Sequence, residues 1–332
     1  MEKGQEVFMN IMTDYGFKRV FGNLHYKPVL LRLLNILFEP EGLKVDDVTY
    51  HDKEVLPKDA DGKRIVYDVY CTSKGEKEHF IVEMQQAYHV NFENRVMYYV
   101  AKGLSEQGKK GDRYNFSPVY GIFFVDFYFE HLQKELLHDF KIMDTKHHQV
   151  FSNILRLLVV CLREVKPSWE KCETELEKLT YIIKNMHNMD KESKAYKSGE
   201  FDDMFEAAEL GNLAAEEMVA YSESKRRYDD MQLSYEWSFT KGQAEGWEKG
   251  WASGEAEGFS KGQAEGYSKG EAEGRAEGRA EGIAEGIAEG IAEGMSDIIR
   301  RLYENGMSIH LIAQALNMPQ DDIKNLLQKN VK

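Results

Sequence analysis

The stretch RIVYDVYCTSKGEKEHFIVEMQQ, residues 64–86, decides the fold of this chain. Two segments rich in Val, Ile, Tyr and Phe, residues 65–72 and 79–86, flank a polar linker that contains one glycine, Gly75. Aromatic and β-branched residues favour strands, and a short polar linker with glycine favours a turn. The stretch is therefore predicted to form a β-hairpin. With Gly75 and Glu76 at the centre of the turn, the numbers of paired residues sum to 151.

Two acidic residues lie directly opposite each other in that register, Asp68 and Glu83. Opposite residues on a hairpin have Cβ atoms about 4.5–5.5 Å apart, and like charges at that distance repel. The pair therefore predicts a cation between the carboxylates, and carboxylate oxygen suits Mg²⁺ or Mn²⁺. Side chains alternate along a strand, so Gln85 shares the face of Glu83 while Met84 points the other way. The alternative is a solvated sheet face with scattered acids, and a slip of one residue would separate the pair.

Length and charge restrict the class of protein. A chain of 332 residues predicts two or more domains. Its 57 acidic and 43 basic residues give a net charge of −14, which argues against a uniformly basic nucleic-acid binder. The acidic excess is concentrated in the Glu-rich segment 243–294, so a local basic surface on the first 130 residues remains open.

Cysteine usage and hydropathy give two further expectations. The three cysteines, Cys71, Cys161 and Cys172, are far apart and support neither a disulfide framework nor a zinc site. The first residues lack a basic segment followed by an apolar run, and no apolar stretch approaches 18 residues. We expect a cytoplasmic protein with no signal peptide and no membrane span.

Helical and extended patterns surround the hairpin. Residues 11–21 predict a helix with Thr13 or Asp14 as N-cap and with Asp14 and Lys18 on one face. A strongly apolar helix follows at 29–38. The remaining predicted elements are a strand at 48–56, a helix at 92–107 that carries Arg95, and a strand buried on both faces at 119–129. The order predicts a mixed α/β sheet.

The second half of the chain is predicted to be helical, with no cluster of titratable residues. Amphipathic helices are expected over 150–165, 169–186, 201–208 and 213–231. The end, residues 295–327, predicts short helices with a turn at Asn305-Gly306 and Ser308 as a cap. This geometry fits a helix-turn-helix. A role in protein contacts or capping is preferred there over DNA reading.

Between these parts lies a repeat in which every fourth residue is glycine, from Gly242 to Gly294. Most units read Gly-x-Ala-Glu. On a helix the glycine line would drift by about 40° per unit, which supports close helix–helix contact with right-handed winding. Each interior glycine costs about 1 kcal/mol relative to alanine. The repeat is predicted to be a partly helical segment that self-associates or is loosely ordered, with self-association preferred.

Several of these motifs together resemble the PD-(D/E)XK nuclease family transposases, also called Rpn-type recombination-promoting nucleases. The motifs are DYGFKRVF at 14–21, then Asp68, then the run Glu83-Met84-Gln85. The segments 176–181, 207–213 and 221–225 look like the helical region of the same family, and the Gly-x-Ala-Glu repeat looks familiar there too. The resemblance covers most of the chain.

The resemblance implies an α/β fold with a restriction-endonuclease-like αβββαβ core, followed by a helical region, the repeat and a small helical unit. The implied domains are a nuclease core at 1–135, a helical domain at 136–235, the repeat at 236–294, helical or linker, and a helix-turn-helix-like unit at 295–332.

The resemblance also assigns site residues. The metal acids map to Asp68 and Glu83, and the carbonyl of Met84 is a further implied ligand. Gln85 stands where the broader superfamily has a lysine, and it cannot supply positive charge. Lys18 or Arg95 is expected to supply it, and Asp14 to assist from the first helix.

The expected function is therefore hydrolysis of DNA phosphodiester bonds by a Mg²⁺- or Mn²⁺-dependent endonuclease, linked to recombination or mobile elements. DNA is the expected partner, and a homo-oligomer is expected through the C-terminal repeat. The alternative is a catalytically silent oligomeric scaffold or nucleic-acid-binding protein on the same fold.

Overall fold

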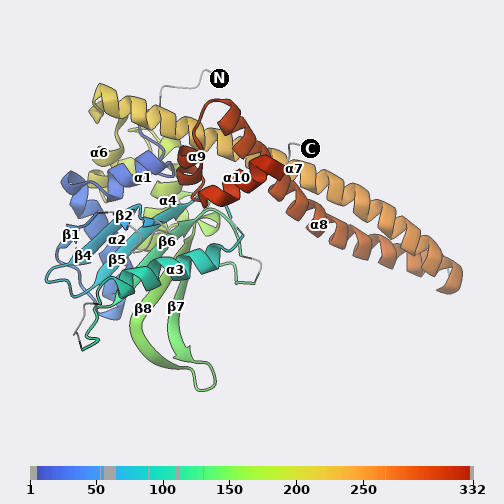
Figure 1. Ribbon diagram of the computed structural model, residues 1–332, viewed down its shortest axis with the longest axis horizontal. Coiled ribbons are helices and arrows are strands. Elements are labelled where there is room, and N and C mark those ends of the chain that lie inside the picture. Colours follow the sequence, from blue (N-terminus) through green and yellow to red (C-terminus); the bar gives the residue numbers. More distant parts are fainter. Residues whose placement is uncertain are drawn as a thin grey trace. The chain divides into compact units, whose positions relative to one another are not determined.

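The structure is a computed structural model that describes residues 6–52, 54–55, 65–88, 90–108, 113–129, 131–265 and 267–329. The chain divides into two compact units, Met1–Ser224 and Lys225–Lys332 (Figure 1). The described helices include none that is long and apolar enough to cross a membrane.

The first unit is built on a six-stranded sheet with the strand order β1-β4-β5-β6-β8-β7. Its strands are β1 (Val48–Tyr50), β4 (Val69–Ser73), β5 (His79–Gln85), β6 (Val119–Val125), β7 (Leu137–Asp144) and β8 (Gln149–Cys161). β5, β6 and β8 run parallel, whereas β1, β4 and β7 pair antiparallel with their neighbours. A separate two-stranded sheet pairs β2 (Glu54–Val55) with β3 (Ile65–Val66). The predicted mixed α/β fold is confirmed.

Helices cover both faces of the sheet, and two neighbouring aromatic residues of β6 show why. Phe124 contacts Phe17 and Phe21 of α1 (Asp14–Phe21). Phe123 points to the opposite face and meets Phe92 of α3 (Phe92–Ser105). Side chains alternate along a strand, so a strand covered on both faces must be apolar at successive positions. β6 reads VYGIFFV, as predicted for a strand buried on both faces.

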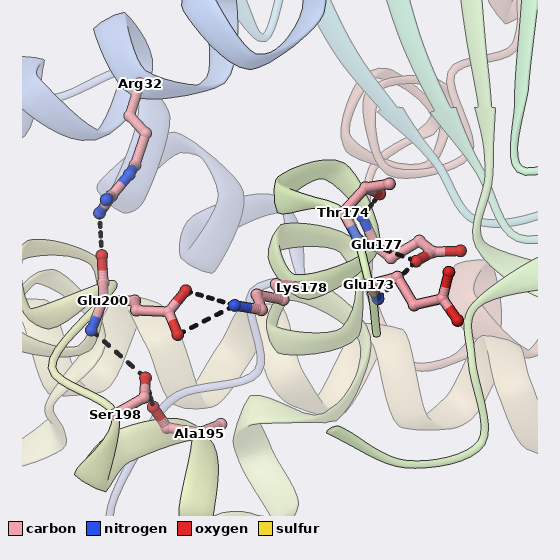
Figure 2. Close-up of polar contacts among 8 residues, drawn as sticks. All are labelled: Arg32, Glu173, Thr174, Glu177, Lys178, Ala195, Ser198 and Glu200. Carbon is pink, nitrogen blue, oxygen red and sulfur yellow. Dashed lines mark hydrogen bonds and ion pairs between the residues drawn. The ribbon is translucent and has the colours of Figure 1, made fainter. Parts of the chain in front are cut away.

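The remaining helices of this unit form a layer joined by polar contacts. They are α2 (Lys27–Phe38), α4 (Glu175–Asn185), α5 (Lys194–Lys197) and α6 (Asp202–Ala208). Short 3₁₀ turns lie at Leu24–Tyr26, Glu39–Glu41, Leu162–Glu164, Trp169–Lys171, Met186–Asn188 and Leu210–Asn212. Figure 2 shows Glu200 joining two of the helices: its carboxylate binds Lys178 of α4, and its backbone carbonyl accepts from Arg32 of α2.

Helix α4 begins at a reciprocal cap, also visible in Figure 2. The Thr174 hydroxyl accepts a hydrogen bond from the Glu177 backbone at 3.2 Å, and the Glu177 carboxylate accepts one from the Thr174 backbone at 3.1 Å. This capping box satisfies two backbone N–H groups that the first turn of a helix leaves without partners. The helix predicted over 169–186 therefore starts later, at Glu175.

The helix predicted over 150–165 is wrong, because this segment forms β8. Leu155 to Cys161 pair in parallel with β6, which places β8 inside the sheet. A short apolar run fits a buried strand as well as a helix, and its own pattern cannot separate the two. The edge of β6, which lies far away in the sequence, decides the outcome. The strands predicted over 48–56 and 65–72 are each also split, into β1 and β2 and into β3 and β4.

The second unit consists of helices. The long helices are α7 (Ala215–Glu265), which begins in the first unit, and α8 (Tyr267–Glu304); the short ones are α9 (Ile309–Ala315) and α10 (Gln320–Lys329). As predicted, Ser308 caps α9 by accepting a hydrogen bond from Leu311, and Gly306 has a positive φ of +83° in the turn before it. Ile299 of α8, Ile312 of α9 and Ile323 of α10 are fully buried at the centre of the cluster that these three helices form.

The glycine repeat brings α7 and α8 into direct backbone contact. A Cβ atom added to Gly286 would lie 2.5 Å from the Gly242 carbonyl oxygen, and one added to Gly282 would lie 2.6 Å from the Gly250 backbone nitrogen. Similar contacts occur at Gly242, Gly246, Gly250 and Gly290. The described part of the repeat is therefore helical, and its close helix–helix contact joins two segments of one chain. Self-association of copies through the repeat stays a prediction.

Replacing both Gly282 and Gly286 by alanine is expected to destabilise the second unit, although alanine is the better helix former by about 1 kcal/mol per site. Each added methyl group would overlap backbone, and overpacking costs typically about 1–3 kcal/mol per site. Thermal unfolding followed by circular dichroism at 222 nm measures the effect. The control is Gly211→Ala, where no atom lies within 4 Å of the added Cβ. An increase in helix stability in the double variant would contradict the observed packing.

Candidate active site

The hairpin of β4 and β5 has the predicted register. The pairs run from Val69 opposite Val82 to Thr72 opposite His79, so the numbers sum to 151. Gly75 and Glu76 both have positive φ, +80° and +53°, as a tight turn at that centre requires. Local turn chemistry therefore fixes which residues of the two strands meet.

Asp68 and Glu83 are joined reciprocally across the two strands. The backbone N–H of Asp68 donates to Glu83 Oε1 at 3.0 Å, and the backbone N–H of Met84 donates to Asp68 Oδ2 at 3.0 Å. Asp68 lies between the end of β3 and the start of β4. Its carboxylate accepts the hydrogen bond from the Met84 N–H that a backbone carbonyl would accept in a continuous strand. Each carboxylate is thus held by the main chain of the opposite strand.

Helix α1 brings a cation and a third carboxylate to this pair. Lys18 Nζ lies 3.4 Å from Asp68 Oδ1 and also pairs with Asp14, one turn earlier in the helix. Thr13, not Asp14, is the N-cap, and its hydroxyl accepts a hydrogen bond from the Gly16 backbone at 3.0 Å. Asp14 is therefore free of the capping role and orients Lys18.

Gln85 shares its amide between two partners. Its Oε1 accepts a hydrogen bond from the Arg95 guanidinium, and its Nε2 donates to the Ala87 carbonyl at 2.9 Å. The Arg95 guanidinium lies over the rings of Phe92 and Tyr99 of the same helix, 5.6 and 6.0 Å from their centroids. The structure thus places all the predicted site residues around the ends of β4 and β5, on three elements far apart in the sequence.

Burial makes the acid pair expensive to ionise. Glu83 is only 4% exposed. Burial, with the charge of Asp68 adding to it, raises the pKa of Glu83 well above its usual value. Burial also raises the pKa of Asp68, while the charge of Lys18 opposes that rise. Burial alone would lower the pKa of Lys18, but Asp68 and Asp14 outweigh it and raise the pKa. The pair therefore favours a bound cation or proton.

The donor atoms fit a hard divalent cation. The side chains at the centre of the site offer carboxylate oxygen, but the described residues hold no group of three or more His, Cys, Asp or Glu side chains that could bind a metal ion together. Mg²⁺ usually keeps several waters and binds through one or two carboxylates, whereas structural Zn²⁺ takes four nitrogen or sulfur ligands. Asp68 and Glu83 satisfy the first requirement. The Met84 carbonyl as a further ligand stays a prediction.

A protein-family model described as PD-(D/E)XK nuclease family transposase matches residues 11–237. The chain belongs to this family. Comparison with curated proteins and with solved structures found no match. The match extends beyond the sheet and includes every predicted site residue, together with the segments 176–181, 207–213 and 221–225 that carried the resemblance.

The geometry explains why this nuclease-family domain extends to the start of α7. The Tyr221 hydroxyl accepts a hydrogen bond from the Asn10 backbone at 2.8 Å, and the Ser224 hydroxyl accepts one from the Tyr15 backbone at 3.0 Å. Arg19 of α1 pairs with Glu217. The beginning of α7 therefore holds the helix that carries Lys18 and Asp14. The sequence predicts a helix here but no contact with the helix that carries these site residues.

A second contact that the sequence analysis missed is made by Gln86. Its amide donates a hydrogen bond to the Met12 carbonyl, which ties the end of β5 to the turn before α1. The available signal was the adjacent pair Gln85-Gln86 at the end of an otherwise apolar strand. Alternation sends the two amides to opposite faces, so one reaches Arg95 and the other reaches the start of α1.

Replacing Glu83 by the neutral glutamine is expected to raise the stability of the metal-free protein at neutral pH. A carboxyl with a raised pKa keeps its proton in the folded state to higher pH than in the unfolded chain, so stability falls as pH rises through the folded pKa. Glutamine does not titrate, so the stability of the variant is expected not to fall with pH in this way. Melting temperatures from pH 5 to 8 with EDTA measure the effect, with the exposed Glu206→Gln as control. Parallel curves for wild type and Glu83→Gln would contradict the assigned electrostatics.

Proposed function

We propose that the protein is a Mg²⁺- or Mn²⁺-dependent endonuclease that hydrolyses DNA phosphodiester bonds, with a role in recombination or mobile-element biology. The observation that carries this proposal is the reciprocally held pair of Asp68 and Glu83 with Lys18 beside it. Family membership supports nuclease chemistry. DNA is the proposed partner, and a homo-oligomer through the C-terminal repeat and a cytoplasmic location stay predictions.

In the proposed mechanism Asp68 and Glu83 hold the metal. A divalent ion bound there would supply Lewis-acid polarisation of a phosphate oxygen and a water of lowered pKa. The backbone hydrogen bonds to both carboxylates fix their position before substrate arrives. The site is therefore electrostatically preorganised. The chain thereby orients the ligands without any rearrangement of the hairpin.

Lys18 is proposed to stabilise negative charge on the scissile phosphate. Its raised pKa keeps the ammonium protonated throughout the physiological range. Asp14 holds the ammonium near Asp68. A cation that stands beside the metal ligands can screen the charge that develops on the phosphate oxygens.

Gln85 and Arg95 are proposed to share the role of the superfamily lysine. Gln85 carries no charge, but it contacts the Arg95 guanidinium, whose charge also acts on Glu83 and Asp68. Arg95 thus places a permanent positive charge next to the acid pair. Gln85 acts as a positioning residue in this arrangement.

A catalytically silent scaffold or nucleic-acid-binding protein is the second candidate. One observation favours it: both ends of the Gln85 amide are engaged, and Lys18 is paired with two carboxylates. Neither group therefore reaches a substrate without giving up a contact. Activity on DNA separates the two candidates.

Nicking of supercoiled plasmid with Mg²⁺ or Mn²⁺ tests the nuclease. Asp68→Asn is expected to abolish nicking, and Lys18→Met is expected to slow it by about 100- to 1000-fold, the loss typical for removal of one electrostatic stabiliser. The matched control is Lys27→Met, since Lys27 pairs with Asp47 instead of the acid pair. Absence of nicking by wild type with either metal would favour the silent scaffold. Equal nicking by wild type and Asp68→Asn would remove Asp68 from the site.

Metal binding can be measured without catalysis. Titration with Mg²⁺ or Mn²⁺ is expected to raise the melting temperature of wild type and of Lys18→Met, because a ligand at 100 times its Kd stabilises by about 2.7 kcal/mol. Asp68→Asn and Glu83→Gln are expected to show no such rise. An equal rise in all four proteins would place the metal elsewhere.

A further inference from the structure

The strands β7 and β8 form a ribbon that extends beyond the other strands of the sheet (Figure 1). Its outer part, which we call the arm, comprises residues 140–153. Most of the arm is exposed, whereas β8 becomes buried from Leu158 onwards, where it enters the sheet. An isolated two-stranded hairpin is marginally stable in water. The arm therefore needs support beyond its own hydrogen bonds.

The arm exposes large apolar side chains. Phe151 is 84% exposed, although its side chain is fully apolar. The other exposed apolar residues of the arm are Phe140, Ile142, Met143 and Val150. Scattered exposed apolar residues are normal on a protein surface, but a contiguous group marks an interaction surface. Phe140 and Ile142 share one face of β7, and Met143 with its partner Val150 lies on the other, so the arm exposes apolar side chains on both faces.

The base of the arm is rigidly held. The Arg156 guanidinium donates to both carboxylate oxygens of Asp139, at 2.7 and 2.8 Å, and also pairs with Glu41. Lys141 pairs with the same two acids. A fixed base presents the arm in one orientation, which reduces the entropy lost when a partner binds.

β7 forms the outer edge of the sheet, and within the described residues no further strand pairs with it. The ladder between β7 and β8 contains an irregularity: Lys141 pairs with Arg156, but the next residue, Ile142, pairs with Ser152. The unpaired residues therefore belong to β8, and β7 itself stays regular. Natural edge strands are usually protected by prolines, charged side chains (lysine above all) or bulges. β7 reads LHDFKIMD, which contains no proline, and its charged residues Asp139 and Lys141 are ion-paired within the chain. Its edge is open to another strand.

We propose that β7 pairs antiparallel with β7 of a second copy of this chain, with Phe140 of both copies on the twofold axis. In this register Lys141 lies opposite Asp139 of the second copy, and Met143 lies opposite Leu137 of the second copy. The register thus brings opposite charges together at positions 139 and 141 and apolar residues together at positions 137 and 143, while His138 lies opposite Ile142. A twofold interface of this kind is closed, so it gives a dimer and not a fibre. The proposal is independent of the nuclease activity.

The charges of the arm favour a second copy over DNA. Between residues 137 and 153 the two acids Asp139 and Asp144 balance the two bases Lys141 and Lys146. Binding to DNA depends on an excess of lysine and arginine that contacts phosphates. A ribbon with no formal net charge and an apolar surface lacks that excess, and the net charge of −14 on the chain gives it no help.

Cysteine cross-linking of the full-length chain tests the register. A residue on a twofold axis meets its own copy, so Phe140→Cys is expected to form a disulfide-linked dimer on mild oxidation. The three natural cysteines are buried, which leaves the introduced thiol as the exposed one. The control is Tyr114→Cys, at a position 85% exposed in the same unit, and it is expected to remain monomeric on denaturing gels.

Light scattering gives the second readout. Phe140→Asp is expected at half the mass of wild type at micromolar concentration, because two carboxylates would face each other on the axis; this ratio holds whether or not the repeat also self-associates. Leu24→Asp, at a 70% exposed position, is the matched control and is expected to stay dimeric. A monomeric wild type, or a dimer whose Phe140→Cys variant does not cross-link, would overturn the proposal. If Phe140→Asp fails to fold, the cross-link decides the matter.

Discussion

The site depends on a pair of like charges that the backbone holds together. Asp68 and Glu83 would repel each other and separate in a flexible chain, but each accepts a hydrogen bond from the main chain of the opposite strand. The hairpin turn fixes those strands in register, and the parallel pairing of β5 with β6 helps to bury Glu83. Electrostatic strain at this position is therefore maintained by the cooperative stability of the sheet.

The helices around the sheet complete this arrangement. α1 supplies Lys18 and is itself held by the beginning of α7, through Tyr221 and Ser224. α3 supplies Arg95, whose guanidinium donates a hydrogen bond to Gln85. Positive charge thus reaches the acid pair from two helices that cover opposite faces of the sheet. Lys18 carries this charge to Asp68, and Arg95 carries it to the amide of Gln85.

A different constraint governs the repeat. Glycine is a poor helix former, and a line of glycines lowers the stability of an isolated helix. The contacts at Gly242, Gly282 and Gly286 show the advantage that offsets this cost: without Cβ atoms, two helix backbones can touch along their length. The contact between the two backbones forms only when both segments are helical and aligned. Formation of the two helices and their packing are therefore cooperative.

The sequence by itself determined the features that depend on residues close together in the chain. These are the register of the hairpin, set by the turn at Gly75-Glu76, the cap at Ser308, and the opposition of Asp68 and Glu83. Only the tertiary structure decided that residues 149–161 form a strand, because that outcome depends on the edge of β6. It likewise decided that Arg95 meets Gln85 and that the glycines of one chain meet each other. Contacts between distant segments depend on how whole elements pack, and the residue pattern of one segment does not specify which other segment it will contact.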